Sequence, residues 1–195
     1  QVFILSAPSG GGKSSLARAL AENCDHVMTS VSHTTRNIRP GETDGVDYNF
    51  VDVDTFERMI AGGGFVEYAN VFGQYYGTSR VAIVGNLAAG KSVVLDMDWQ
   101  GARQVRDAFK DAVSIYILPP SLEVLAERLS ARGREDDKQL QERLSKASSE
   151  MSHFNEYDYL MINTHFEDAL LELENLVLSG KRPTSADNFD VKGLV

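Results

Sequence analysis

Residues 6–15 read SAPSGGGKSS, a glycine-rich stretch that contains the pair Lys13-Ser14. An apolar run, Val2–Leu5, precedes this stretch, and a helical pattern that begins at Leu16 follows it. A strand, a glycine-rich turn and a helix in this order are typical of a P-loop, whose backbone N–H groups and helix dipole favour a phosphate anion. In that setting Lys13 reaches the outer phosphates of a nucleoside triphosphate, and the Ser14 hydroxyl binds Mg²⁺.

One position departs from the general P-loop pattern G-x-x-x-x-G-K-[ST], because Ala7 stands where the pattern begins with glycine. The alternative interpretation is an ordinary glycine-rich turn with a solvated lysine. The flanking strand and helix favour the P-loop, since the motif requires both of them in these positions.

The composition narrows the class of protein. The chain has 195 residues, 43% of them apolar and 24% charged, which is typical of a globular protein with one sizeable core. Its net charge of −9 argues against a general nucleic-acid-binding surface. Cys24 is the single cysteine, so no intrachain disulfide can form, and no apolar run approaches the roughly 18 residues that span a bilayer. Because no signal peptide is visible either, we expect a cytoplasmic protein without membrane or nucleic-acid partners.

Strands and helices alternate along most of the chain. Short apolar segments predict strands at 2–5, 27–32, 93–96, 113–118 and 159–162, and the helical spacing of apolar residues predicts helices between them and at 166–179. Regular alternation around a P-loop favours an α/β fold, with a parallel sheet flanked by helices. We expect the polar segment 132–138 to be mobile, and the tail after Lys181 to be poorly ordered or to lie on the surface.

Residues 33–80 interrupt this alternation. Turn residues at Asp44-Gly45 and short β segments at 48–51 and 65–68 surround a predicted helix. The capping box Asp54–Glu57 opens this helix, and the glycines at 62–64 end it. The stretch therefore predicts a small α+β lobe inserted into the main sheet.

Two acidic residues, Asp96 and Asp98, follow the apolar run at 93–95. An aspartate at such a strand end belongs to the metal shell in P-loop proteins, and two acids one residue apart on a strand point the same way. The alternative is a solvated strand end. The four histidines are scattered and predict no metal site.

Residues 32–41 read SHTTRNIRPG, with two arginines three residues apart. Arg36 and Arg39 could clamp a phosphate through forked, charge-assisted hydrogen bonds. Tyr48 and Tyr76 could add phenolic donors. The alternatives are arginines that are simply solvated in a polar loop, and tyrosines that are half-buried for packing.

Glu67 lies in an apolar stretch, GFVEY, where a carboxylate is costly to bury unless donors surround it. Guanine offers two such donors on adjacent atoms, the ring N–H and the exocyclic amine, whereas adenine presents an acceptor at the ring nitrogen. The Thr78 hydroxyl could donate to the guanine carbonyl. Buried polar groups of this kind can discriminate by a factor of order 10⁴ or more.

Three arginines surround the polar segment 132–138. Arg128 and Arg132 are four residues apart on one helix face, and Arg143 lies on the next helix. Arginines that a closing lid brings over phosphates can stabilise the charge on a transferring phosphoryl group. The alternative is salt bridging with nearby acidic residues.

These motifs together resemble those of the bacterial guanylate kinases in order and spacing: SAPSGGGKSS, SVSHTTRNIRPGE, DYNFV, FVEYANVFGQYYGTSR, VLDMDWQGA, ILPPS, ERLSARG and EMSHFNEYDYLMIN. The resemblance extends from Val2 to about Gly180. It implies a CORE with the parallel sheet at 1–32, 82–122 and 150–195, a GMP-binding lobe at 33–81 and a small helical LID at 123–149.

The resemblance also implies an activity, the phosphorylation of GMP and dGMP by ATP through direct in-line transfer, with Mg²⁺ as cofactor. The implied ATP-binding residues are Ala7, Pro8, Ser9, Gly10, Gly11, Gly12, Lys13, Ser14, Ser15, Arg128, Arg132 and Asn163. The implied GMP-binding residues are Ser32, Arg36, Arg39, Tyr48, Glu67, Tyr76, Gly77, Thr78 and Asp98. The implied catalytic residues are Lys13, Arg36, Arg128, Arg132 and Arg143, and the implied metal-binding residues are Ser14 and Asp96.

Two other functions stay open at this point. A guanylate-kinase-like interaction domain has the same fold and binds phosphorylated peptides, but such domains characteristically lack the P-loop lysine. A nucleoside monophosphate kinase for another base is the second alternative, and Glu67 with Thr78 argues against adenine. The sequence leaves open whether the protein is a monomer or a dimer.

Overall fold

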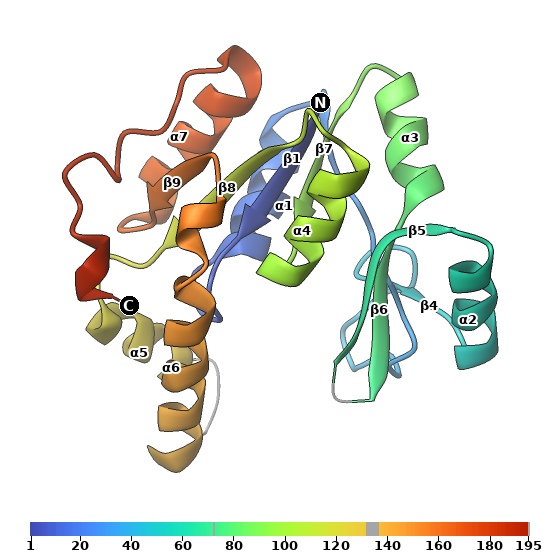
Figure 1. Ribbon diagram of the computed structural model, residues 1–195, viewed down its shortest axis with the longest axis horizontal. Coiled ribbons are helices and arrows are strands. Elements are labelled where there is room, and N and C mark those ends of the chain that lie inside the picture. Colours follow the sequence, from blue (N-terminus) through green and yellow to red (C-terminus); the bar gives the residue numbers. More distant parts are fainter. Residues whose placement is uncertain (72, 132–136, 195) are drawn as a thin grey trace.

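A five-stranded parallel sheet forms the centre of the computed structural model, which describes residues 1–71, 73–131 and 137–194 (Figure 1). The strand order is β2-β7-β1-β8-β9, and each of the four pairings is parallel. The strands are β1 (Val2–Ser6), β2 (Val27–Thr29), β7 (Ser92–Asp96), β8 (Val113–Leu118) and β9 (Tyr159–Ile162). The predicted α/β fold with a flanked parallel sheet is therefore confirmed.

Both faces of this sheet are covered by helices. Successive residues of β1 point to opposite sides, so its apolar side chains pack against helices on both faces. Phe3 and Leu5 pack in one cluster with α1 (Lys13–Asn23) and α7 (Phe166–Ser179). Val2 and Ile4 pack on the other side with α3 (Arg80–Ala88) and α4 (Trp99–Ala108). Burial on both faces explains why the strands read as continuous apolar runs.

A third cluster joins the sheet to α5 (Leu122–Ser130), α6 (Asp137–Met151) and the chain after α7. In this tail Leu194 is only 4% exposed, and the Ser185 hydroxyl accepts a hydrogen bond from the Ile162 N–H (2.9 Å). Ser185 also donates to Glu172 (2.5 Å). The prediction of a poorly ordered or superficial tail is therefore wrong for these residues, which sequence patterning alone does not link to the core.

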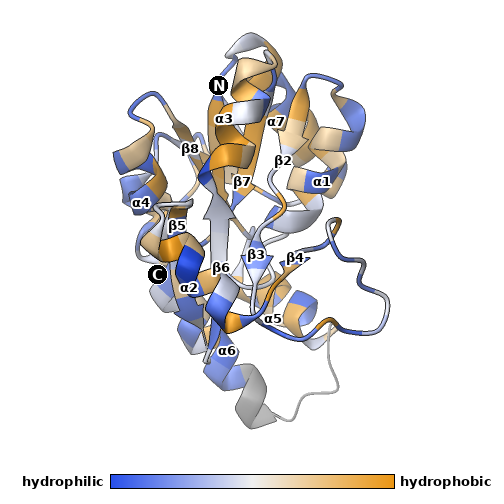
Figure 2. Cartoon of the chain, turned by 90° about the vertical axis from the view of Figure 1, so that its right-hand side faces the viewer, coloured by the Kyte–Doolittle hydropathy of each residue, from blue (hydrophilic) through white to orange (hydrophobic). Residues whose placement is uncertain are grey.

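The predicted inserted lobe contains a separate four-stranded sheet in the order β4-β3-β6-β5. Its strands are β3 (His33–Thr34), β4 (Asn49–Phe50), β5 (Phe65–Val71) and β6 (Gln74–Ser79), and α2 (Val53–Ala61) packs on it. Phe56 of α2 is fully buried and stacks on Phe65 and Tyr75, with ring centroids 4.4 and 5.1 Å apart. Figure 2 shows the contrast between the apolar strands of the main sheet and the paler β6.

Several local boundaries differ from the sequence predictions, and the β segments predicted at 48–51 and 65–68 are strands at 49–50 and 65–71. The N-cap of α2 is Asp52, whose side chain accepts from the Thr55 N–H at 2.6 Å, so the helix begins before the predicted capping box at Asp54. The strand predicted at 27–32 ends at Thr29, and the chain leaves the main sheet there for the inserted lobe.

Candidate active site

The glycine-rich loop lies between β1 and α1, and two residues with left-handed backbone angles shape it. Gly10 has a φ of 86°, and Gly12, which caps α1, has a φ of 94°. The Gly11 N–H donates to the Pro8 carbonyl oxygen (2.9 Å), and the Leu16 N–H donates to that of Gly12 (3.0 Å), so the loop leads directly into the helix. The first N–H groups of a helix have no partner inside it, so a turn of this shape is suited to binding an anion.

Close contacts require small residues in this loop. A Cβ at Gly12 would lie 2.6 Å from Nδ2 of Asn163, which is buried and donates to the Gly11 carbonyl oxygen (3.0 Å). A Cβ at Gly11 would lie 2.7 Å from the Ala7 Cβ. Ala7 itself does not have a positive φ, which explains why the first P-loop position needs no glycine here.

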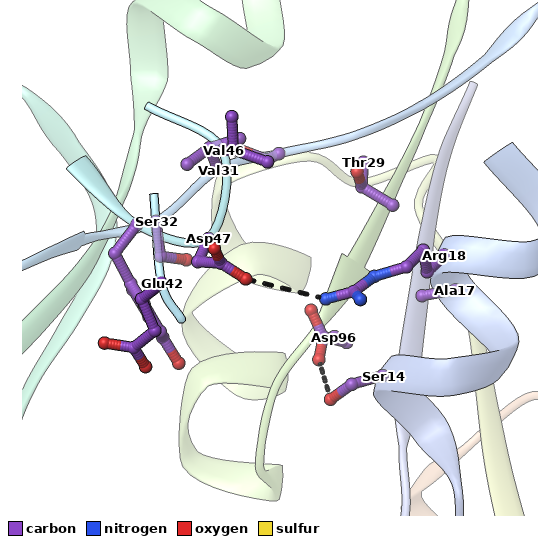
Figure 3. A pocket seen from close by; sticks show the side chains of 12 residues that line it. Ser14, Ala17, Arg18, Thr29, Val31, Ser32, Glu42, Val46, Asp47 and Asp96 are labelled. Carbon is purple, nitrogen blue, oxygen red and sulfur yellow. Dashed lines mark hydrogen bonds and ion pairs between the residues drawn. The ribbon is translucent and has the colours of Figure 1, made fainter. Parts of the chain in front are cut away.

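Ser14 and Asp96 meet beside the loop because β7, which ends at Asp96, is parallel to β1. The Ser14 hydroxyl donates to the Asp96 carboxylate (2.5 Å), as Figure 3 shows. Hard oxygen atoms of this kind are what Mg²⁺ binds, usually one or two from the protein together with water and phosphate oxygens. The pair therefore fits Mg²⁺. Among residues 1–71, 73–131 and 137–194, no group of three His, Cys, Asp or Glu side chains is arranged to hold a metal.

Two of the predicted LID-side arginines contact the glycine-rich loop or Asn163, which binds the loop. Arg128 on α5 donates from Nη2 to the Asn163 carbonyl oxygen (2.8 Å), and Arg143 on α6 lies 3.4 Å from the Ser9 hydroxyl through its Nη2. The third predicted arginine, Arg132, lies outside the described residues.

Glu150 is a neighbour of the loop that the sequence reasoning missed. Its carboxylate accepts a hydrogen bond from the Ser9 N–H (3.1 Å), and its carbonyl oxygen accepts one from the Tyr116 hydroxyl (2.8 Å). The last turn of α6 is thus bonded both to the loop and to β8. A separation of 141 residues between Ser9 and Glu150 leaves no sequence signal for this contact.

A second polar group lies in the inserted lobe, where β5 and β6 pair Glu67 with Thr78. The Thr78 hydroxyl, which is almost fully buried, donates to Oε1 of Glu67 (2.5 Å), and the Ser32 hydroxyl lies 3.5 Å from that of Thr78. Burial raises the pKa of the Glu67 carboxyl, the Thr78 hydrogen bond opposes this effect, and the Asp98 charge adds to it. Glu67 and Thr78, the two residues predicted to read the base, are thus brought together with Ser32. The Thr78 hydroxyl, predicted to donate to a guanine carbonyl, donates to Glu67 instead.

Asp98 and Gly101 form the other boundary of this group. Asp98 is the N-cap of α4 rather than a strand residue, and its carboxylate accepts from the Gly101 N–H (2.9 Å). A Cβ at Gly101 would lie 3.3 Å from Oε2 of Glu67. The first turn of α4, which belongs to the main sheet's layer, therefore packs directly on the carboxylate of the inserted lobe.

Arg36 is the centre of the second cluster in the lobe. Its Nη1 and Nη2 donate to the two oxygens of Glu42 (3.0 and 2.8 Å), and Nη1 also donates to the Asn37 carbonyl oxygen (2.7 Å). Glu42, and to a smaller degree Tyr76, raise the Arg36 pKa. Three of five guanidinium N–H bonds are used in this way, so one edge of the fork is directed elsewhere. Glu42 had no predicted role.

The tyrosines surround this guanidinium. The Arg36 guanidinium lies 5.4 Å from the centre of the Tyr48 ring, and the rings of Tyr48 and Tyr76 meet edge to face at 5.9 Å. Burial, followed by the Asp96 charge, raises the Tyr48 pKa. Arg39 is exposed and donates its backbone N–H to Glu42 (2.8 Å). Three of these predicted phosphate-binding residues are thus in one cluster, with Arg39 at its rim.

Packing explains why residue 77, one of the predicted GMP-binding residues, is a glycine. A Cβ there would lie 2.9 Å from ring atoms of both Phe56 and Phe65, so the lobe's aromatic core requires glycine at this position of β6.

A cavity of about 210 Å³ connects the loop with the lobe (Figure 3). Ser14 and Asp96 line it on one side, and Ser32, Glu42 and Tyr48 line it on the other. An exposed ion pair that the sequence reasoning also missed, Arg18–Asp47 at 3.8 Å, crosses it between α1 and the 42–48 loop. The predicted metal-binding residues Ser14 and Asp96 therefore share one space with Tyr48, one of the predicted phosphate-binding residues.

The parallel sheet, the glycine-rich loop and the helix capped by Gly12 define a P-loop nucleotide-binding protein. Comparison with known proteins specifies it further. Residues 1–179 match the family described as guanylate kinase. The chain belongs to the guanylate kinase family.

Individual relatives agree with this assignment. A guanylate kinase from Chromohalobacter salexigens is 56% identical over 176 residues, which are 90% of this chain and 82% of the relative. A guanylate kinase from Aliivibrio fischeri is 49% identical over 196 residues, covering 100% of this chain and 95% of the relative. The crystal structure of guanylate kinase from Anaplasma phagocytophilum superposes with a TM-score of 0.74 at 36% identity, covering 94% of this chain and 87% of that one.

Within the described parts of the chain, every helix is too short or too polar to cross a bilayer.

Proposed function

We propose that this chain transfers the terminal phosphoryl group of ATP to GMP, giving ADP and GDP. Membership of the guanylate kinase family supports the reaction. The observation that carries the proposal for this chain is the shared cavity, which has the P-loop residue Ser14 and Asp96 on one side and Ser32 and Tyr48 on the other. Two anionic nucleotides have to meet in such a space for direct transfer.

The base-recognition role falls to Glu67, Thr78 and Ser32. An ionised Glu67 accepts from the guanine ring N–H and the exocyclic amine, and the Thr78 hydroxyl contacts the same carboxylate at 2.5 Å. Adenine lacks both donors in that arrangement, so it would leave a partly buried charge without partners, which is costly.

The GMP phosphate is assigned to Arg36, Arg39, Tyr48 and Tyr76. Because Glu42 holds the Nη1–Nη2 edge of Arg36, the edge formed by Nε and the second Nη2 hydrogen can bind two phosphate oxygens. The role of Glu42 is then to orient the arginine, which explains why an acidic side chain lies in an anion-binding cluster.

No general base is required, because the second pKa of a phosphate monoester is near 6 and the acceptor oxygen is already ionised at neutral pH. Catalysis then consists of positioning and charge neutralisation. Lys13 and the P-loop N–H groups bind the ATP phosphates, and Arg128, Arg132 and Arg143 approach them from the LID side. When bound at Ser14 and Asp96, Mg²⁺ would neutralise charge on the phosphates.

The division into CORE, GMP-binding lobe and LID at the boundaries given above belongs to the same proposal. It is supported by the containment of the four-stranded sheet within residues 33–79. Use of dGMP and a cytoplasmic location remain predictions from the sequence.

The test is coupled measurement of ADP production from ATP and Mg²⁺ with GMP, AMP, CMP and UMP as acceptors. We expect turnover with GMP alone. Glu67→Gln should lower kcat/KM for GMP by about 10- to 100-fold, because a hydrogen bond to a charged group is worth about 1.5–3 kcal/mol. Glu57→Gln, on the exposed side of α2, is the matched control and should leave kcat/KM unchanged. Folded protein without turnover on any acceptor would refute the proposal and favour a phosphopeptide-binding function.

A further inference from the structure

Outside the shared cavity, side chains of α4 bind the segment that follows α6. Four side chains form a clasp, Trp99 and Arg103 on α4, and His153 and Glu156 around the short helix η1 (Phe154–Glu156). Arg106 on α4 supports it, because its Nη1 donates to the Glu156 carbonyl oxygen and its Nη2 lies 3.8 Å from the Glu156 carboxylate. The rings of Trp99 and His153 stack with centroids 3.8 Å apart at an interplanar angle of 15°. The Arg103 guanidinium lies 4.5 Å from the centre of the Trp99 ring. Trp99 is thus in contact with a partner on each element.

A forked ion pair fixes the clasp. Arg103 donates from Nε and Nη2 to the two carboxylate oxygens of Glu156 (2.8 and 2.6 Å), and His153 Nδ1 lies 2.7 Å from one of them. The Glu156 and His153 side chains are only 22% and 23% exposed. A guanidinium that is both stacked and forked cannot be replaced by an ammonium group, so the arrangement is specific to arginine.

One end of the clasp is anchored in the core. The segment bearing His153 and Glu156 follows Met151, which is fully buried, and Glu150, which binds Ser9 and Tyr116. The other end reaches the base-recognition residues, because Trp99 is the first residue of α4 and Gly101 in the same turn packs on Glu67.

The contact at Gly101 has little spare room. A Cβ at this position would lie 3.3 Å from Oε2 of Glu67 and 3.1 Å from the Met97 sulfur. Thr78 fixes the other carboxylate oxygen, Oε1. The orientation of Glu67 therefore depends on where the first turn of α4 lies. The same holds for the position of Oε2, which would accept from the second guanine donor.

We propose that Arg103 is a positioning residue for guanine recognition, which it serves by holding the first turn of α4 against Glu67 through Glu156 and Trp99. The proposal rests on the function proposed above for Glu67. It predicts a defect in the use of the acceptor nucleotide, with the chemical step and the ATP site intact.

The experiment measures steady-state constants of Arg103→Met for GMP, for IMP and for ATP. IMP keeps the ring N–H of guanine but lacks the exocyclic amine, so it reports on one of the two donors. We expect KM for GMP to rise about fivefold, since one well-placed hydrogen bond is worth about 1 kcal/mol. The preference for GMP over IMP should fall by a similar factor, while kcat and KM for ATP change less than twofold.

Arg182→Met is the matched control, because Arg182 also forms a forked pair, donating from Nη1 and Nη2 to Asp187 (3.0 and 2.8 Å) on the tail. It should leave all constants unchanged. Glu156→Gln removes the acceptor side of the clasp and should reproduce the Arg103→Met pattern, and Arg103→Lys should not restore the wild-type constants.

Trp99 is the single tryptophan of the chain, so its fluorescence reports the clasp without any turnover. We expect a red-shifted emission in Arg103→Met and Glu156→Gln, and none in Arg182→Met. Unchanged KM for GMP and unchanged GMP-over-IMP preference in both clasp variants would overturn the proposal, as would a loss of kcat alone. Failure of the proposed function differs from both results, since the wild-type protein itself would then not phosphorylate GMP.

Discussion

The P-loop and the inserted lobe both face one cavity, but they are built from different groups. Backbone N–H groups form the P-loop, and its shape is imposed by glycine angles and by the contact between Asn163 and Gly11. Side chains form the lobe's cluster, and they hold each other in place, as Glu42 holds Arg36 and Thr78 holds Glu67. A backbone site tolerates almost no change in size, whereas a side-chain site depends on matching charges. Three predictions test this difference, and a fourth concerns an ion pair outside both regions.

The largest effect is expected at Lys13, the positively charged side chain of the P-loop. Lys13→Ala should lower kcat by about 10²- to 10³-fold, the usual cost of removing a preorganised charge from a transition state. Coupled ADP production measures it. Lys110→Ala, which breaks only the exposed pair with Asp107, is the control. Near-normal turnover of Lys13→Ala would show that the P-loop lysine has no role in catalysis.

The rigidity of the backbone site is tested by Gly12→Ala. We expect a loss of unfolding free energy of about 2–3 kcal/mol, because alanine combines an unfavourable φ with the 2.6 Å approach to Asn163. Gly63→Ala has the same kind of angle (65°) with no atom within 4 Å, so it should cost only about 1 kcal/mol. Chemical denaturation of both variants measures the difference. Equal losses would mean that the backbone angle alone, and not packing, fixes the loop.

The side-chain site is tested by Glu42→Gln. Without the forked carboxylate, Arg36 loses its orientation, and we expect KM for GMP to rise about fivefold, as for the loss of one hydrogen bond of about 1 kcal/mol. KM for ATP should stay the same. A fall in KM for GMP would instead show that Glu42 competes with the phosphate for Arg36. It would contradict the view that side chains of the lobe hold each other in place for binding.

The smallest effect concerns an ion pair outside both regions. Arg103, and then His153, lower the Glu156 pKa from 4.5 to about 2. Its ionised form is therefore stabilised in the folded protein, and this contribution is complete above pH 4.5 and lost as the pH falls toward 2. We expect the free energy of unfolding of the wild-type protein to exceed that of Glu156→Gln by about 1 kcal/mol at pH 7. This value is modest because the pair is partly exposed. The difference should shrink in thermal melts at pH 3, and a constant difference would contradict the assigned pKa.

Local patterns were sufficient to predict most of the fold. The P-loop and most of the apolar strands are encoded within a few residues, and the structure places them as predicted. The cap of α2 was misplaced because Asp52 and Asp54 both precede a suitable partner by three residues, and only the fold selects between them.

The sequence was sufficient to predict most of the candidate site residues, but not the residues that contact them and hold them in place. Candidate residues such as Glu67 and Arg36 stood out because charged groups in those sequence settings need partners. The partners Glu42, Glu150 and Gly101 did not stand out, since an acidic residue in a polar segment or a glycine in a helix has many ordinary explanations. The roles of Glu150 and Gly101 depend on contacts between distant segments, and the role of Glu42 depends on how its own loop folds, and no periodicity encodes either.

The contact between Ser185 and Ile162 has a consequence for the behaviour of many copies in solution. β9 is the outermost strand on its side of the main sheet, and such a strand exposes backbone groups that can pair with another molecule. Ser185 occupies one of these N–H groups, and Glu172 holds Ser185 in place. The tail thereby protects this margin of the sheet against strand-to-strand aggregation.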